Sequence, residues 1–185
     1  MVKIKEEFKA KLKNLKEYVA IATISSDSYQ ETNLAIVNYL TKENIPGVYI
    51  TLNKPFETMQ EIFTKNKIDK RLIIFIDAVT KTAGGKTKKT KNCLFIGSPE
   101  NLSDISLAMD QAVRALSAKE KFVFFDSLST LLLYNSIEVT ARFIHFLASK
   151  MRVWKVKGII ISLQKEKDKE LINELMQFCD VKLDF

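Results

Sequence analysis

One acidic residue stands out as a candidate for chemistry because of the residues around it. Asp126 follows the largely apolar run KFVFF and precedes Ser127. A carboxylate directly after a buried strand lies at the edge of a sheet, where α/β folds place their ligands. In proteins that handle phosphates, such an aspartate holds Mg²⁺ directly or through water. The other interpretation is structural, since a carboxylate also accepts hydrogen bonds from nearby backbone amides or caps the next turn.

Few other residues offer catalytic chemistry. Asp77 ends the apolar run RLIIFI and is either a second acidic group at the same sheet edge or a turn residue. The chain has one histidine, His145, so a His-based triad or a multi-histidine metal site lacks the residues that it needs. His145 lies between Ile144 and Phe146 in a predicted helix, which favours a place at the edge of the core or on the surface.

Length and composition are those of a globular chain. Its 185 residues are enough for one domain, predicted to span residues 1–185, and the hydrophobic (46%) and charged (28%) contents exclude a disordered chain. No apolar run approaches the ~20 residues that cross a bilayer, and residues 1–16 lack the apolar core of a signal peptide. No membrane partner is therefore expected. Cys93 and Cys179 lack metal-ligand spacing and are predicted to be buried thiols, which favours a cytoplasmic protein.

The formal net charge is +7, and lysines concentrate in two segments, residues 3–16 and 81–91. A basic surface can bind nucleic acid, an acidic protein or anionic lipid, or can simply be solvated. The second segment is predicted to be a surface loop, and its five lysines are candidates for contact with an acidic partner or a phosphate backbone: Lys81, Lys86, Lys88, Lys89 and Lys91. Because no aromatic residues are interleaved with these lysines, the pattern argues against base stacking.

Apolar periodicity predicts alternating strands and helices. The predicted strands are 18–24, 47–52, 71–79, 93–97, 121–125, 158–163 and 181–185. The predicted helices are 3–16, with a basic outer face, 31–43, 55–66, 101–116, 136–153 and 167–178. This alternation implies parallel strands joined by right-handed helical crossovers. The fold class is therefore α/β, a three-layer α/β/α arrangement around a mostly parallel sheet.

Segments that follow one another in order resemble the RecA-type ATPase core of the KaiC-like group common in archaea. They are AIATISSDSYQETNLAIVNYL (20–40), GVYITLNKPFETMQEIF (47–63), KFVFFDSLSTLLLY (121–134), and VKGIIISLQ (156–164) followed by QFCDVKLDF (177–185). The resemblance implies a RecA-like P-loop NTPase fold over nearly the whole chain, with Asp126 as the Walker B acid. Since RecA-type cores usually assemble through surfaces beside the nucleotide site, it also implies self-association.

The phosphate loop departs from this family. A P-loop has the pattern G-x-x-x-x-G-K-[ST], in which glycines turn backbone amides toward the phosphates, the lysine neutralises them and the hydroxyl reaches Mg²⁺. The matching residues read SSDSYQET: Ser25 and Gln30 replace the glycines, Glu31 replaces the lysine, and Thr32 is retained. At ~4–6 Å and an effective dielectric constant of about 20, a carboxylate opposes a phosphate by on the order of 3 kcal/mol per charge pair. Tight ATP binding is therefore not expected.

A second departure is independent of the first. KaiC-like relatives typically carry an acidic pair after the second strand, one member of which activates the attacking water. The matching residues here are Asn53 and Lys54, and neither can act as a carboxylate base. No residue is therefore assigned a catalytic role.

These residues predict a KaiC-like pseudo-ATPase with a degenerate Walker A motif, which acts as a regulatory or interaction module through a protein partner or self-association. The altered nucleotide site consists of Thr32, Asp126 and Ser127, with Ser25, Gln30 and Glu31 at the loop. No tightly bound cofactor is expected, and any Mg²⁺ that enters with ATP is expected on Asp126.

Two alternatives remain open at this stage. The first is an atypical NTPase that uses Thr32 and Asp126 for Mg²⁺ and borrows a cation from the 81–91 loop or a neighbouring subunit. The second is a nucleic-acid-associated accessory protein, similar to non-filamentous recombinase paralogues, for which the net charge and the lysine loop are the support.

Overall fold

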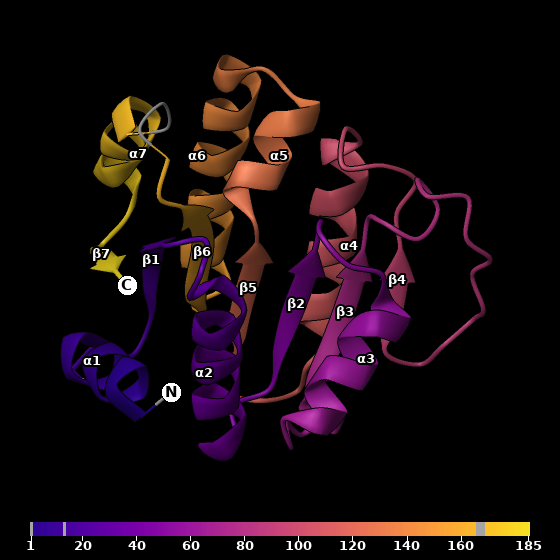
Figure 1. Ribbon diagram of the computed structural model, residues 1–185, viewed down its shortest axis with the longest axis horizontal. Helices are drawn as coiled ribbons and strands as arrows, with labels where there is room; N and C mark the ends of the chain where they lie inside the picture. The colour runs from indigo at the N-terminus through magenta and orange to yellow at the C-terminus, as the bar shows by residue number, and fades with distance from the viewer. Residues whose placement is uncertain (1, 13, 166–168) are drawn as a thin grey trace.

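Seven parallel strands form the centre of the fold, and helices cover both faces of the sheet (Figure 1). The computed structural model describes residues 2–12, 14–165 and 169–185. Every pairing between neighbouring strands is parallel, which confirms the predicted α/β class. In spatial order the strands are β4 (Cys93–Phe95), β3 (Ile73–Asp77), β2 (Gly47–Thr51), β5 (Phe122–Asp126), β6 (Lys157–Leu163), β1 (Tyr18–Ile24) and β7 (Val181–Asp184).

The inner strands are covered on both faces, which explains why each is a continuous apolar run. All seven residues of β1 and all five of β5 are buried. The register aligns Thr51, the last residue of β2, with Asp77 of β3 on one side and Asp126 of β5 on the other. The carboxyl ends of three neighbouring strands therefore meet at one edge of the sheet, and both candidate aspartates lie there.

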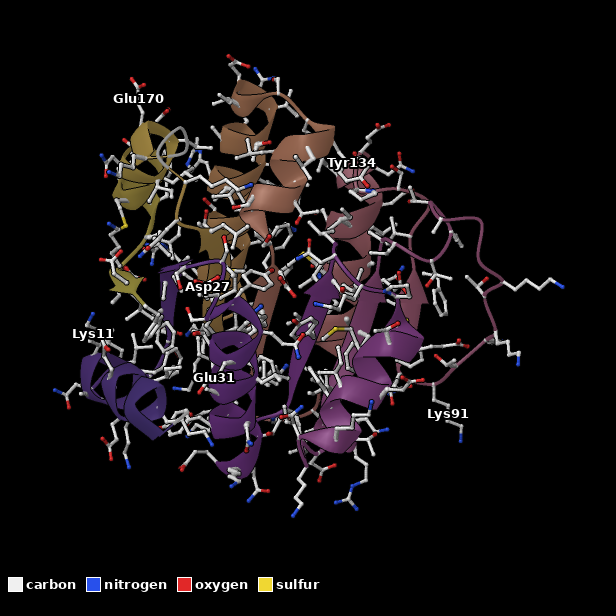
Figure 2. All side chains as sticks on the ribbon, viewed as in Figure 1. Lys11, Asp27, Glu31, Lys91, Tyr134 and Glu170 are labelled. Atoms are coloured by element: carbon white, nitrogen blue, oxygen red, sulfur yellow. The ribbon has the colours of Figure 1, made fainter. Side chains whose placement is uncertain are left out.

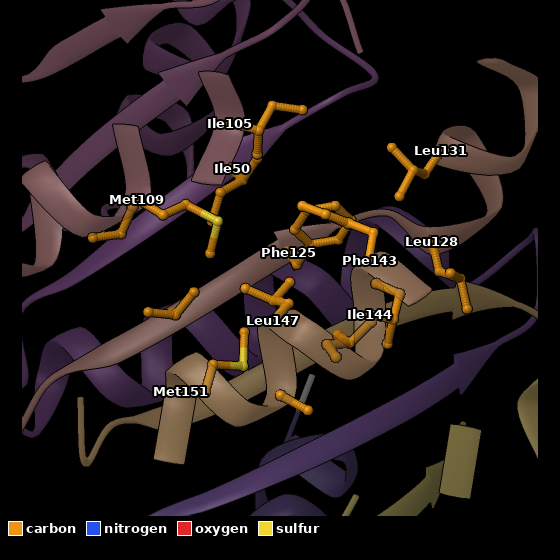
Figure 3. Close-up of a cluster of buried hydrophobic side chains, with 14 of the residues drawn as sticks. Ile50, Ile105, Met109, Phe125, Leu128, Leu131, Phe143, Ile144, Leu147 and Met151 are labelled. Carbon is orange, nitrogen blue, oxygen red and sulfur yellow. The ribbon is translucent and has the colours of Figure 1, made fainter. Parts of the chain in front are cut away.

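The helices form two layers, each with its own hydrophobic cluster. The helices α1 (Val2–Leu12), α2 (Tyr29–Lys42) and α3 (Phe56–Lys65) pack on one face of the sheet. The helices α4 (Leu102–Ala115), α5 (Leu128–Tyr134), α6 (Ile137–Val153) and α7 (Lys169–Leu175) pack on the other. Figure 3 shows the second cluster, in which Phe125 of β5 lies beside Phe143 of α6, with ring centroids 6.1 Å apart. No helix in the described ranges is long and apolar enough to cross a membrane.

Three helices have an end that differs from the predictions by two residues or more: the first, the last, and α2, which begins at Tyr29 instead of residue 31. The first helix stops at Leu12 instead of residue 16, and the Leu15 amide donates to the Leu12 carbonyl at 3.0 Å, which closes a turn. Leu15 was predicted to continue the apolar stripe, but its side chain is exposed (37%) because the helix has already ended. Residue 13, and residues 167 and 168 of the predicted last helix, lie outside the described residues. From residue 169 that segment is α7, followed by a 3₁₀ turn over Met176–Phe178.

One helix was not predicted at all. Residues 128–134, for which the resemblance predicts a loop after the Walker B strand, form the seven-residue helix α5. The Ser127 hydroxyl caps this helix by accepting a hydrogen bond from the Thr130 amide at 3.3 Å. The buried residues Leu128 and Leu131 are three apart and lie on one face of the helix. Because seven residues make only about two turns, this pair is too little for a helical period to be recognised in the sequence.

Candidate functional site

The Asp126 carboxylate is surrounded by neutral hydrogen-bond donors. Its side chain is 4% exposed at the end of β5. One carboxylate oxygen, Oδ1, accepts from the Tyr29 hydroxyl and from Asn53 Nδ2 at 2.9 Å. The other, Oδ2, accepts from the Tyr49 hydroxyl at 2.5 Å. Both oxygens are therefore engaged by donors that carry no charge.

These donors come from three different parts of the fold. Tyr29 is the first residue of α2, Tyr49 lies in the middle of β2, and Asn53 follows β2 in the loop. The Tyr49 ring stacks on Phe124 of the neighbouring strand at 5.0 Å, which aims its hydroxyl along the sheet toward Asp126. A buried phenol needs a hydrogen-bond acceptor, and Asp126 supplies it.

Asn53 is itself held in place by two further bonds. Its Nδ2 also donates to the Tyr29 hydroxyl oxygen at 2.7 Å, and its Oδ1 accepts from the Thr130 hydroxyl of α5. We call Tyr29, Tyr49, Asn53, Asp126 and Thr130 the Asp126 cluster. Because its members belong to α2, β2, β5 and α5 or to the loops beside them, the cluster connects both helical layers through the edge of the sheet.

Burial dominates the electrostatics of the cluster. Loss of solvent raises the pKa of the Asp126 carboxyl, while the hydrogen bonds from Tyr29, Tyr49 and Asn53 and the charge of Lys54 oppose that rise. Burial and the neighbouring Asp126 charge raise the pKa of both tyrosines above the ordinary value. The two phenols therefore keep their protons and remain donors throughout the physiological pH range.

The loop that corresponds to the phosphate loop has four residues, 25–28, between β1 and α2. The Ser25 and Ser28 hydroxyls lie 2.8 Å apart, and the Ser28 amide donates to the Ser25 hydroxyl at 3.4 Å. None of these four residues has a positive φ. The loop is therefore a tight turn that closes on itself, where a glycine-rich loop would turn its amides toward a ligand.

The other positions matched to the phosphate loop lie in the first turn of α2. Gln30 and Glu31 are exposed there, as is Asp27 in the turn before the helix, and Figure 2 labels Asp27 and Glu31. Thr32 is buried, and its amide donates to the Ser28 carbonyl at 2.8 Å. Its hydroxyl has no hydrogen-bond partner among the described residues. Within residues 25–32, Thr32 alone has a buried side-chain oxygen without a partner, as Asn33 and Thr140 also have elsewhere in the described chain.

The contacts of Ser127 are those of a residue with a structural role. It is 1% exposed, follows Asp126 through a cis peptide bond, and caps α5. Its hydroxyl oxygen also lies 3.1 Å from the Thr130 hydroxyl, so the cap and the Asp126 cluster share Thr130.

Asp77 is a turn residue in its contacts. Its carboxylate accepts from the backbone amides of Phe56 and Val79, both at 2.7 Å, and from the Thr80 amide at 2.8 Å and hydroxyl at 2.5 Å. These bonds hold the start of α3 against the turn after β3. Of the two interpretations of Asp77, the contacts agree with the structural one.

The lysine loop lies away from the Asp126 cluster. It connects β3 to β4, the outermost strand on one side of the sheet, and its chain extends outward there (Figure 1). Figure 2 shows Lys91 projecting from it. The strands β3 and β2 separate β4 from β5, so the fold does not bring Lys81, Lys86, Lys88, Lys89 or Lys91 to Asp126. All five are exposed, and Lys81 Nζ donates to the Phe95 carbonyl at 2.9 Å.

No cluster of three metal-ligating side chains occurs among the residues that the structure describes. His145 is exposed and stacks on Phe178, with ring centroids 4.1 Å apart. It lies on α6, as expected for a surface histidine.

Solved structures with this fold include two archaeal proteins. One is an uncharacterised protein, PH0321 from Pyrococcus horikoshii, crystallised in complex with an unknown peptide; its TM-score is 0.71 at 15% identity, over 97% of this chain and 82% of that chain. The other is the KaiC-like protein PH0186 from Pyrococcus horikoshii OT3, with a TM-score of 0.62 at 16% identity, over 90% of this chain and 71% of that chain. The fold is thus the KaiC-like, RecA-type α/β fold.

The chain belongs to a family of unknown function, DUF7504, whose family model matches residues 66–185. This segment includes Asp126 and Thr130 and begins after Tyr29, Tyr49 and Asn53. Among curated proteins, none is significantly similar in sequence.

Tyr29, Tyr49 and Thr130 were not among the predicted site residues. The available signal was the presence of a tyrosine in the buried strand GVYIT, because a buried hydroxyl must find an acceptor. Asn53 was noted only as a missing carboxylate, yet its side-chain amide makes three of the hydrogen bonds in the cluster.

Proposed function

We propose that this protein is a non-catalytic member of the KaiC-like fold group that works as a protein-interaction domain. One observation carries the proposal: both oxygens of Asp126 are engaged by neutral donors from Tyr29, Tyr49 and Asn53. A Walker B carboxylate must be available to Mg²⁺ or its water shell, which Mg²⁺ gives up reluctantly. Asp126 in this setting is a structural acceptor.

The residues of the site do not fit MgATP. Hydrogen bonds to a charged acceptor are each worth about 1.5–3 kcal/mol, and a metal at Asp126 would have to displace some of them. The tight turn at 25–28 supplies no lysine, and the exposed Glu31 adds negative charge at the start of α2. With Asn53 committed to the cluster, no carboxylate is available to activate water at that position.

With nucleotide binding and hydrolysis disfavoured at Asp126, protein binding is the activity that we propose for this domain. The structural neighbour PH0321 was crystallised with a peptide, which supports a similar role for this chain. The partner in the proposal is another protein or a second copy of the chain. The free thiols of Cys93 and Cys179 support a place in the cytosol.

Isothermal titration calorimetry with MgATP tests the proposal. We expect no saturable heat with the wild-type protein, and none with Glu31→Gln as a matched variant that removes the negative charge. Saturable binding in the micromolar range that is lost in Asp126→Asn would overturn the proposal, provided that circular dichroism shows both proteins folded.

One observation favours a second candidate, an atypical nucleotide-binding protein. The buried Thr32 hydroxyl lacks a partner within the described chain, as a group waiting for a metal-bound water would. This candidate predicts phosphate release that rises with protein concentration, as a neighbouring subunit adds its cation. Release that stays at background across a range of concentrations rules it out.

A further inference from the structure

Exposed apolar side chains concentrate on one helical layer of the molecule. Of the seven large apolar side chains that are exposed in the described chain, six belong to α4, α5 and α6: Leu107, Leu133, Tyr134, Ile137, Phe146 and Val153. Scattered single exposures need no explanation, but a concentration on one face is typical of a binding surface.

A groove runs between α4 and α6 within this layer. Its volume is about 550 Å³. The buried ring of Phe143 forms its floor, and the exposed side chains of Leu107 (59%) and Phe146 (44%) form its walls. Leu102 and Val139 close one end of the groove. The middle of the groove is therefore apolar.

The other end of the groove is charged, and its one carboxylate is already neutralised. Asp110 accepts from Arg114 Nε at 2.7 Å and from Trp154 Nε1 at 3.2 Å, and it lies 3.9 Å from Lys150 Nζ. The Lys150 ammonium also lies 5.7 Å from the centre of the Phe146 ring. Two cations satisfy one acid here, so the charged end carries net positive charge.

Besides Lys150, the groove is lined by Arg142, which is exposed and has no direct hydrogen-bond or ion-pair partner among the described residues. The charge of Arg142 contributes to lowering the pKa of Glu138, one turn earlier on α6, but the two side chains form no ion pair. The groove thus presents an apolar centre and two cations, Arg142 and Lys150, eight residues apart on one helix.

We propose that this groove binds an amphipathic α-helix of a partner protein, with acidic residues beside its apolar stripe. The inference rests on the proposed function as a protein-interaction domain and names the surface and the chemistry of the partner. From Val139 to Lys150 the groove follows α6 for about 16 Å, or three helical turns. The partner therefore presents apolar residues at i, i+3 or i+4, and i+7, with acids about two turns apart facing Arg142 and Lys150.

A helix fits the groove better than an extended strand. Both walls are helical side chains, and the backbone groups of α4 and α6 are bonded within their own helices. A strand would find no backbone partner there, whereas a helix satisfies its own backbone and needs only apolar contact and charge.

The chain itself does not supply such a helix in its described part. The described helices bury apolar residues in the two core clusters, and α1 carries four lysines against two glutamates. A partner protein is therefore the occupant to which we commit, and binding of a second copy is an outcome that the test distinguishes.

The test uses a designed helical peptide with leucines at i, i+4 and i+7 and glutamates flanking them, and a version with lysines in place of the glutamates. We expect the acidic peptide to bind the wild-type protein, and Phe146→Ser to weaken binding by about tenfold or more, as for a central apolar contact. Leu133→Ser is the control, because Leu133 is exposed but lies outside the groove. Arg142→Glu should weaken the acidic peptide and improve binding of the lysine version.

Three results would overturn the inference. The first is equal binding of both peptides, and the second is equal loss in Phe146→Ser and Leu133→Ser. The third is absence of peptide binding together with a dimer, seen by analytical ultracentrifugation, that Leu107→Glu disrupts, since this would make a second copy the occupant. Thermal melting of each variant checks its folding. MgATP binding by the wild-type protein would contradict the proposed function. It would not decide whether the groove binds a helix, which the peptide experiments test independently.

Discussion

At the scale of single residues, Asp126 is a buried acid whose partners are all neutral. A desolvated carboxylate without partners would be costly, and the three donors offset that cost. The sequence located Asp126 at a strand end and noted Asn53 beside the second strand. It could not identify Tyr29 and Tyr49, because periodicity predicts which side chains are buried but not which hydroxyl meets which oxygen. That pairing depends on the strand register and on where α2 begins.

Removal of one donor from this acid should destabilise the protein. Tyr49→Phe keeps the ring that stacks on Phe124 and deletes only the hydroxyl that donates to Asp126. We expect the free energy of unfolding to fall by about 1–3 kcal/mol, because a buried carboxylate oxygen loses its partner. Urea denaturation followed by circular dichroism measures the change. Tyr134→Phe, at an exposed site, is the control and should leave the midpoint unchanged; similar midpoints for both variants would contradict a structural role for the Tyr49 hydroxyl.

At the scale of elements, β1, β2, β5 and β6 were predicted to within one residue, whereas β3, predicted over 71–79, spans only Ile73–Asp77. Parallel strands buried on both faces must be continuously apolar, so β1 was predicted with its observed bounds and β5 within one residue. The helix α5 was missed because seven residues hold too few turns to show a period, and its start depends on the Ser127 cap. The first helix was predicted too long because Leu15 extends the apolar spacing, although the chain turns after Leu12.

The packing of β2 against β5 depends on a position without a side chain. A Cβ at Gly47 would lie 2.4 Å from ring atoms of Phe122, which is buried and pairs with it across the two strands. Gly47→Ala should therefore lower the free energy of unfolding by about 1–3 kcal/mol through overpacking. Gly97→Ala is the matched control, since only the Asn101 amide, at 3.1 Å, approaches that position and the exposed Asn101 can move. Equal thermal midpoints for the two variants would show that the strands accommodate the added methyl group.

At the scale of the whole molecule, the lysine loop and the exposed apolar side chains belong to different parts of the fold. The lysine loop extends from the β3–β4 side of the sheet (Figure 1). The exposed apolar side chains lie on α4, α5 and α6. Composition revealed the net charge of +7 but not this arrangement, because the position of a loop relative to a helical layer follows from the strand order. The groove between α4 and α6 was likewise invisible in the sequence, where Leu107 and Phe146 are ordinary members of apolar helical stripes.

The lysine loop should bind nucleic acid only through charge. The exposed side chains of its five lysines have no interleaved aromatic residues on which bases could stack. We expect any DNA complex seen in a gel shift at low salt to disappear near physiological salt, because affinity falls by about 0.9 logarithmic units per neutralised phosphate for each tenfold rise in salt. Replacement of Lys86, Lys88 and Lys89 by Gln should remove the low-salt complex. A complex that survives physiological salt would instead favour a nucleic-acid role.

The ring of hydrogen bonds around Asp126 also bears on how such a protein would be regulated. Under the proposed function, Asp126 stays occupied by Tyr29, Tyr49 and Asn53, and the protein passes through no cycle of triphosphate binding and cleavage. Its binding to a partner would then be independent of the energy state of the cell. Control would then fall to the abundance of the two proteins and to competitors for the same surface.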